Sequence, residues 1–169
     1  MRSDVSFVFA RASNPVWRWF SKLVAYKPLT LFFMYVATRV DRPLMRVSGG
    51  RLRLSFVVPA LLLRCRGART GRIREVPLLY VPDGDGVLLI ASNGGQHRAP
   101  GWCHNLRAGP EVECVLAGRV FGYRSEELSG EQYTAAWARA IDLYPGYARY
   151  AERSGRLIPL FRLSRLDSL

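Results

Sequence analysis

Cysteine, histidine and acidic residues are scarce in this chain, and each shortage argues against a class of protein. Its 169 residues include three cysteines, Cys65, Cys103 and Cys114, which are odd in number, widely spaced and free of any C-x-x-C pair. This pattern excludes a disulfide framework and fits a reducing cytoplasm. The two histidines, His97 and His104, lack the i,i+4 spacing and the H-E-x-x-H pattern of a zinc helix. The sequence therefore predicts no metal site.

The shortage of acidic residues leaves a large positive charge. Asp and Glu number 13 against 25 Lys and Arg, so the net charge is +12 and the pI is near 10.5. Such a charge indicates an anionic partner: nucleic acid, an anionic lipid surface or a phosphorylated small molecule. The basic residues are spread along the chain and no helix-turn-helix or RNA-binding motif occurs, which makes nucleic acid the least favoured of the three.

Long hydrophobic runs are also missing. The longest uncharged stretch near the N-terminus covers residues 28–38, whereas a membrane-spanning helix needs about 20 apolar residues. No apolar segment is followed by the small-residue cleavage site of a secretory signal. We therefore expect a cytoplasmic protein.

The chain divides into two regions. Residues 1–56 are aromatic and basic, and they predict an amphipathic helix from Pro15 and a second one over residues 29–40. Such a segment either lies in a membrane interface at the inner face of the cell membrane, or packs on the rest of the protein or on a second subunit of a homodimer. Residues 57–169 form the second region, which predicts alternating strands and helices.

Turn residues punctuate this second region clearly. Ser129, with Gln132 three residues later, has the spacing of a capping box at the start of a helix whose face carries Tyr133, Trp137, Ile141 and Tyr144. Pro145 and Gly146 separate it from a shorter helix that ends near Ser154, and a third helix is expected over residues 99–108. Strands are expected over residues 60–66, 75–81, 87–92, 111–116, 120–125 and 157–163. This is a mainly β, α+β pattern typical of a small barrel or sandwich with added helices.

Two glycine-containing turns offer binding chemistry. Residues 67–74 (G-A-R-T-G-R-I-R) carry Arg69 and Arg74, which could clamp a phosphate with help from Thr70 and backbone N–H groups. The other reading is a solvated basic loop. Residues 91–95 (A-S-N-G-G) follow a buried strand, and their paired glycines allow a flat ligand to approach. By itself this second segment reads as an ordinary turn.

Two further segments carry reactive side chains. In P-G-W-C-H-N-L, Trp102 and Leu106 share one helical face and are predicted to be core, whereas Cys103 and His104 point apart, which argues against a Cys–His nucleophile. In Y-P-G-Y-A-R-Y, Tyr147 and Tyr150 share a face. Phenols stack on flat substrates and donate protons, but they equally serve as core residues.

Together these stretches resemble the deazaflavin-dependent nitroreductases, also called the coenzyme F420-dependent quinone reductases of actinobacteria. The resemblance covers residues 61–163 through G-A-R-T-G-R-I-R-E-V-P-L-L-Y, D-G-D-G-V-L-L-I-A-S-N-G-G, P-G-W-C-H-N-L-R-A-G-P-E-V and L-Y-P-G-Y-A-R-Y, in that order. No single stretch is specific, but their order and spacing are. The resemblance implies a split β-barrel related to the FMN-binding barrel. It also implies hydride transfer from reduced F420 to a quinone, a nitro compound or a similar hydrophobic, electron-poor acceptor.

The resemblance also implies site residues. The cofactor carries a phosphate and a polyglutamate tail, in keeping with the basic chain. Arg69 and Arg74 would hold the phosphate, Ser92 would bond the ring system, and Tyr147 would place the acceptor and donate a proton, with Tyr144 and Tyr150 closing over the substrate. The cofactor-binding positions implied are Ala68, Arg69, Thr70, Arg74, Glu75, Val76, Pro77, Ile90, Ala91, Ser92, Asn93, Gly94, Gly95, Gly101, Trp102, Cys103, His104 and Asn105.

Some positions depart from the family pattern. Its phosphate loop usually reads G-R-K-S-G, but here Ala68 and Arg69 stand at the two basic positions, with Arg72 adding charge nearby. Asn93 replaces a lysine of some members, and Leu79 an active-site tyrosine of one branch. These departures bear on the substrate more than on the cofactor class. Two other readings remain open: an FMN-binding oxidoreductase with the same fold, and a carrier that holds a flat ligand without turnover.

Overall fold

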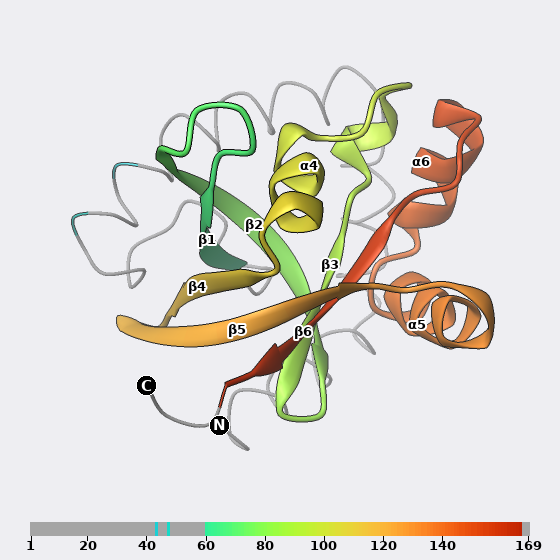
Figure 1. Cartoon of the computed structure of the whole chain (residues 1–169). Helices are drawn as coiled ribbons and strands as arrows, with labels where there is room; N and C mark the ends of the chain where they lie inside the picture. Colours follow the sequence, from blue (N-terminus) through green and yellow to red (C-terminus); the bar gives the residue numbers. More distant parts are fainter. Residues whose placement is uncertain (1–42, 44–46, 48–59, 167–169) are drawn as a thin grey trace.

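A six-stranded antiparallel barrel forms the body of the described chain (Figure 1). The structure is a computed structural model that describes residues 43, 47 and 60–166. The strand order is β1-β2-β3-β6-β5-β4, and pairing of β1 with β4 closes the barrel. The strands are Ala60–Arg66 (β1), Ile73–Asp83 (β2), Gly86–Ile90 (β3), Glu111–Leu116 (β4), Arg119–Glu127 (β5) and Leu160–Arg165 (β6). The expected mainly β barrel with added helices is confirmed.

Within residues 60–166, three α-helices and one short 3-10 helix interrupt the strands. They are Asn93–Gly95 (η1), Gly101–Ala108 (α4), Gly130–Leu143 (α5) and Gly146–Ser154 (α6). No helix among the described residues has the length and apolar character needed to cross a bilayer. The helices predicted within residues 1–56, and the domain boundary at residue 57, lie outside the described residues.

The barrel interior follows the two-residue period of its strands. In β1, Leu61, Leu63 and Cys65 all point inward and are almost completely buried. From α4, Trp102 packs into the same core and meets the ring of Phe161 edge-to-face, with 5.5 Å between the ring centroids. Each such large buried side chain stabilises the fold by about 1.5–3 kcal/mol relative to exposure, so α4 is anchored to the barrel through its apolar face.

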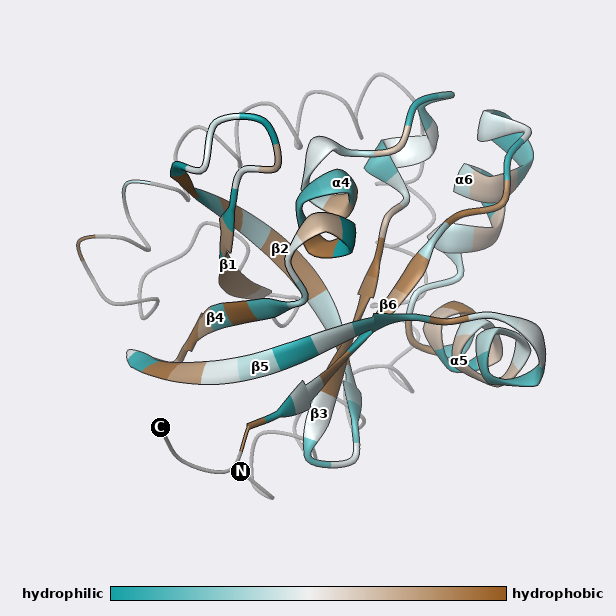
Figure 2. Cartoon of the chain, viewed as in Figure 1, coloured by the Kyte–Doolittle hydropathy of each residue, from teal (hydrophilic) through white to brown (hydrophobic). Residues whose placement is uncertain are grey.

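The other two helices cover the outside of the barrel. Apolar side chains on the outer faces of β2, β3 and β6, such as Leu88 and Leu160, form a second core with α5 and α6. Ala136 and Ala140 are the completely buried residues of α5, and their small size lets the helix approach the strands closely. Strand β3 is hydrophobic along most of its length (Figure 2), because it is covered on both faces.

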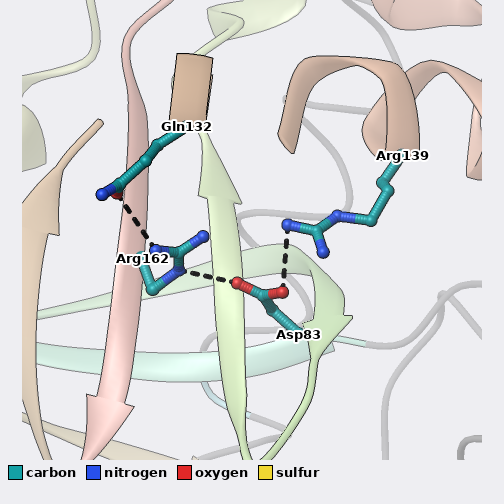
Figure 3. A network of polar contacts seen from close by, with 4 residues as sticks. All are labelled: Asp83, Gln132, Arg139 and Arg162. Carbon is teal, nitrogen blue, oxygen red and sulfur yellow. Dashed lines mark hydrogen bonds and ion pairs between the residues drawn. The ribbon is translucent and has the colours of Figure 1, made fainter. Parts of the chain in front are cut away.

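A polar network fixes α5 to the barrel (Figure 3). Asp83, at the end of β2, accepts a 2.8 Å hydrogen bond from Arg162 Nε of β6 and lies 3.0 Å from Arg139 Nη2 of α5. Arg162 Nη1 also donates to Gln132 Oε1 of α5 at 3.2 Å. The Asp83 carboxylate is 12% exposed, so the two guanidiniums compensate a charge that has lost most of its water.

Gln132 corrects one sequence prediction. The expected capping box at Ser129 and Gln132 is wrong, because Ser129 makes no side-chain capping bond and Gln132 instead accepts from Arg162. The helix itself starts where expected. A charged donor from another strand has displaced the local partner, since hydrogen bonds to charged groups are the stronger ones.

Several element limits also differ from the predictions. Strand β2 extends to Ile73–Asp83, β3 ends at Ile90, and β6 begins at Leu160, while the helix expected from residue 99 starts at Gly101. Barrel pairing decides these limits, because β2 is paired with β1 from Ile73 to Leu79 and with β3 from Tyr80 to Asp83. The buried side of α5 is likewise made by Ala136, Ala140 and Leu143, whereas Tyr133, Trp137 and Ile141 are half-buried.

Candidate functional site

The two glycine-containing turns lie at the same end of the barrel. Strands β1 and β3 both run antiparallel to β2, so the turns that follow them leave the barrel in the same direction. Strands β4 and β6 run antiparallel to β1 and β3, so α4 and α6, which precede them, approach this end as well (Figure 1). Antiparallel connectivity therefore gathers all four sequence segments that were singled out.

The first turn, residues 67–74, is called here the arginine turn. Arg69, Arg72 and Arg74 are all exposed on it. Its backbone is closed by bonds from Gly67 N to Arg72 O (2.8 Å) and from Gly71 N to Gly67 O (2.8 Å). Since the N–H groups of Gly67 and Gly71 are already bonded within the turn, what it exposes are chiefly guanidiniums rather than these backbone donors.

Asn105 of α4 is hydrogen-bonded to the backbone of the arginine turn. Its Oδ1 accepts from Ala68 N at 3.0 Å, and its Nδ2 donates to Cys65 Sγ at 3.5 Å. Burial raises the pKa of the Cys65 thiol, which the bond from Asn105 partly offsets. Both ends of the amide are therefore engaged within the protein, and Asn105 links the turn, α4 and β1.

The second turn, residues 92–96, is called here the glycine turn. Asn93, Gly94 and Gly95 have φ values of 48°, 61° and 77°, so three successive residues adopt the left-handed region. Asn93 Nδ2 donates to Arg98 O at 2.9 Å. A Cβ on Gly95 would lie 3.2 Å from Tyr150 Cα and 3.3 Å from Tyr150 O. Gly95 is therefore needed for the close approach of this turn to α6.

Three side chains that the sequence analysis did not single out for the site connect the glycine turn with the end of α6. Arg153 Nη1 donates to Gly94 O at 3.3 Å, and His97 Nδ1 lies 3.0 Å from Ser154 O. Arg156 donates to the carbonyl oxygens of Ala91, Ser92 and Gln96. The only local signal is the cluster of arginines around Gly155, and nothing in it indicates a partner about 60 residues away.

The start of α4 is mostly directed into the core. Trp102 and Cys103 are buried, whereas Gly101 and His104 are exposed. Burial raises the pKa of the Cys103 thiol to about 12, and the charge of Arg107 only partly offsets this. Cys103 is therefore a neutral core thiol that points away from His104, as expected from adjacent helical positions.

The tyrosines form a cluster in the second core. Tyr144 Oη and Tyr150 Oη are 3.0 Å apart, and the Tyr144 and Tyr147 rings meet edge-to-face at 5.1 Å. All three are at most 8% exposed. Burial is the main cause that raises the pKa of Tyr144 and of Tyr147, so both phenols are neutral at pH 7 and are weaker acids than an exposed tyrosine.

The remaining predicted positions lie on the strands. On β2, Glu75 accepts from Arg64 Nε at 3.1 Å, and Val76 and Pro77 are half-buried. At the end of β3, Ile90 packs with the tyrosines and Ala91 belongs to the barrel core. The structure thus places the glycine turn against the tyrosine cluster and the arginine turn against α4.

Comparison with known proteins finds similarity to one family over most of the chain. A family model described as F420H(2)-dependent quinone reductase matches residues 37–164. An F420H(2)-dependent quinone reductase of Mycobacterium tuberculosis is 35% identical over 132 residues, which cover 75% of this chain and 89% of that protein.

Two solved structures are also similar. An F420-H2-dependent reductase, FDR-A, is 34% identical with a TM-score of 0.58, over 63% of this chain and 94% of that one. A protein solved as a domain-swapped dimer is 32% identical with a TM-score of 0.61, over 75% and 94% of the two chains. The six-stranded barrel described above matches the split barrel of the F420-dependent reductase.

Proposed function

From the premise that this chain belongs to the F420H(2)-dependent quinone reductase family, we propose that it transfers a hydride from reduced coenzyme F420 to a quinone, a nitro compound or a similar electron-poor acceptor. Family membership makes the protein an oxidoreductase with coenzyme F420 as its cofactor. The bound coenzyme supplies the hydride chemistry, while the protein binds, orients and excludes water.

One observation supports this site above the others: the arginine turn, the glycine turn and α4 share one end of the barrel, and the tyrosine cluster adjoins the glycine turn. The side chains present suit the coenzyme. The exposed guanidiniums of Arg69, Arg72 and Arg74 match an anionic phosphate and polyglutamate tail. We therefore assign the tail to the arginine turn, with Ala68 and Thr70 beside it.

The glycine turn and the start of α4 are assigned to the ring system. Ser92, at the end of the buried strand β3, offers a hydroxyl, and Gly94 and Gly95 contribute backbone groups. At the start of α4, Gly101 and His104 are exposed and are assigned to the ring site as well. Trp102 and Cys103 support the ring site from within the core rather than through polar contacts.

The tyrosine cluster is assigned to the acceptor. Tyr147 is the proposed proton donor, because the resemblance implies that role for it and it belongs to the tyrosine cluster that adjoins the glycine turn. Tyr144 and Tyr150 share a hydroxyl pair that fixes their rings, and thus the wall that a flat, apolar acceptor would meet.

Binding and turnover test this proposal directly. Reduced F420 should be oxidised by the purified full chain in the presence of menadione or a nitroaromatic. In parallel titrations, the protein should bind F420 more tightly than FMN. Absence of F420 binding at micromolar concentration would end the proposal, and tighter binding of FMN would make FMN the cofactor.

Charge variants test the assignment of the tail. Arg69→Ala and Arg74→Ala should each weaken F420 binding about 10- to 100-fold, since each removes a charge-assisted hydrogen bond. Arg119→Ala is the matched control, because Arg119 is an exposed arginine in the β4–β5 hairpin at the other end of the barrel. A deazaflavin analogue without phosphate should bind the wild type and the Arg69 variant equally. If Arg69→Ala weakened binding of this analogue as much as it weakens binding of F420, the assignment of the tail would be contradicted.

Two further assignments concern assembly and location. The basic, aromatic residues 1–56 suit a cytoplasmic protein that touches the inner face of the cell membrane, and co-sedimentation with anionic vesicles, compared with neutral ones, tests this. The similar protein solved as a domain-swapped dimer supports a homodimer. Light scattering after size exclusion would contradict it if only a monomer were found.

A further inference from the structure

Arg156 follows α6 and reaches across the site into the glycine turn. It comes directly after Gly155, which ends the helix in the left-handed conformation with φ 60°. The sharp turn made by Gly155 directs the following residues back toward the barrel, and the Arg156 side chain is only partly exposed. Its position is therefore set by the C-terminal cap of α6.

The guanidinium of Arg156 binds both ends of the glycine turn. Nη2 donates to Ala91 O at 2.9 Å and to Ser92 O at 3.3 Å, where β3 ends. Nε donates to Gln96 O at 3.2 Å, where the turn ends. One rigid, planar group therefore sets the distance between the entry and the exit of the turn, a geometry that lysine cannot reproduce.

Neighbouring contacts join the same two segments. Arg153 donates to Gly94 O, His97 lies against Ser154 O, and Gly95 packs on the backbone of Tyr150. The segment of residues 91–97 and the segment of residues 150–156 are thus held together along their whole lengths. Tyr150 is hydrogen-bonded to Tyr144, so this unit includes part of the acceptor side of the proposed site.

The charge of Arg156 is compensated by carbonyl dipoles. Within the described residues 60–166, no carboxylate forms an ion pair with it. Carbonyl oxygens carry only partial charge, so a net positive potential remains beneath the glycine turn. Such a potential favours a bound group that is electron-rich or anionic.

We propose that Arg156 is a positioning residue that holds the glycine turn in register with the tyrosine cluster, so that a single side chain sets the geometry of both the cofactor side and the acceptor side. This inference rests on the proposed function for its link to turnover. Its structural part does not need that function, because it depends only on the hydrogen bonds from Arg156 to the glycine turn.

Hydrogen–deuterium exchange of the ligand-free protein tests the structural part. In Arg156→Ala, the amides of residues 91–97 should exchange about tenfold faster or more, because three bonds from a charged group are lost. Amides of β4 and β5 should be unchanged. Arg124→Ala is the control, since it removes an exposed arginine whose partner, Glu111, lies across the β4–β5 pair. Unchanged exchange in residues 91–97 of a folded Arg156→Ala protein would overturn the proposal.

Steady-state kinetics test the functional part. Loss of positioning should raise KM about tenfold for both F420 and menadione, whereas a loss of folded protein alone would lower kcat and leave both KM values unchanged. Added guanidinium ion at millimolar concentration should restore part of the loss in Arg156→Ala. Arg156→Lys keeps the charge but loses the planar guanidinium with its several N–H donors, so it should behave like the alanine variant. Wild-type KM values in the lysine variant would contradict positioning by the guanidinium.

These outcomes separate the two proposals. If the wild type fails to bind F420, the proposed function fails, while the exchange experiment still decides the role of Arg156. If the wild type is active and Arg156→Ala is folded with unchanged KM values, only the positioning role fails. Should the alanine variant not fold, Arg156→Lys carries both measurements.

Discussion

The two turns at the end of the barrel that carries the candidate site are built in opposite ways. The arginine turn closes on itself through bonds between residues no more than five positions apart, with Asn105 as a link to α4. The glycine turn depends on residues about 60 positions away, Arg153 and Arg156, and on contact with Tyr150. A locally closed turn suits the flexible tail of a ligand, whereas a turn fixed by tertiary contacts suits a rigid ring whose placement decides the reaction.

The largest effect is expected at Gly146, in the helix that supports the glycine turn. A Cβ at this position would overlap the Cζ, Cε1 and Oη atoms of Tyr144, so Gly146→Ala must expel that ring from the second core. The cost should be about 3–5 kcal/mol, comparable to deleting a buried aromatic side chain. Urea unfolding measures it, and a loss below 1 kcal/mol would mean that α6 adjusts freely.

The next effect compares the two turns directly. Gly71 and Gly95 both have positive φ, but a Cβ on Gly71 meets nothing within 4 Å, whereas one on Gly95 meets the backbone of Tyr150. Gly71→Ala should cost about 1–2 kcal/mol for the left-handed conformation alone. Gly95→Ala should cost about 1–3 kcal/mol more, because α6 must move. Equal losses in thermal unfolding would show that tertiary packing does not distinguish the turns.

A smaller effect is expected at the link between the arginine turn and α4. Asn105→Ala removes the bond to Ala68 N, an exposed amide that water can then satisfy, so the free energy of unfolding should fall by about 1 kcal/mol. Asn105→Asp keeps the acceptor for Ala68 and is the matched control. If F420 affinity fell in both variants while stability did not, Asn105 would contact the coenzyme rather than hold the turn.

The smallest effect concerns pH and the ion pair that ties α4 to β5. Arg107 Nε and Nη2 donate to Glu127 at 2.6 and 2.7 Å, and this pair lowers the pKa of Glu127. A carboxyl with a lowered folded-state pKa stabilises the protein above its unfolded pKa of about 4.3, and this contribution is lost as the pH falls through the folded value. The difference in unfolding free energy between wild type and Glu127→Gln should be under about 1 kcal/mol at pH 7, because the pair is half-exposed. It should vanish only when the pH is low enough to protonate Glu127 in the folded protein as well. A difference that persists there would exclude the ion pair as its source.

Local patterns predicted much of the barrel. Strand β1 has the expected limits, α6 ends at the expected Ser154, and β4 and β5 are joined within residues 117–119, which separate the two expected strands. Alternating apolar residues and turn-forming glycines and prolines carry this information within a few positions. The face of α5 was predicted in part: Tyr144 is buried and Tyr133 and Trp137 pack against the second core, but the completely buried residues are Ala136 and Ala140. The partner of Gln132 was not predicted, because a charged donor on β6 decides it.

The candidate site likewise has residues that local patterns predicted and residues that only tertiary contacts reveal. Arg69 and Arg74 were proposed from their charge beside two glycines, Tyr147 and Tyr150 from their spacing, and Tyr144 from the resemblance to the family. The contacts of Arg153 and Arg156 with residues 91–97 could not be predicted from the sequence. Their acceptors are backbone carbonyl oxygens, which every residue type has, so the sequence of the turn does not indicate them.

The sequence by itself determined the family, through the order and spacing of the stretches that resemble it. It also determined most strands and turns, the basic character of the chain and the segments of the candidate site, because periodicity, turn chemistry and charge are properties of neighbouring residues. Only the tertiary structure decided which turn is joined to the tyrosines, and by which side chain. That depends on the closure of six strands, which brings Arg156 to the end of a strand 66 positions earlier in the chain.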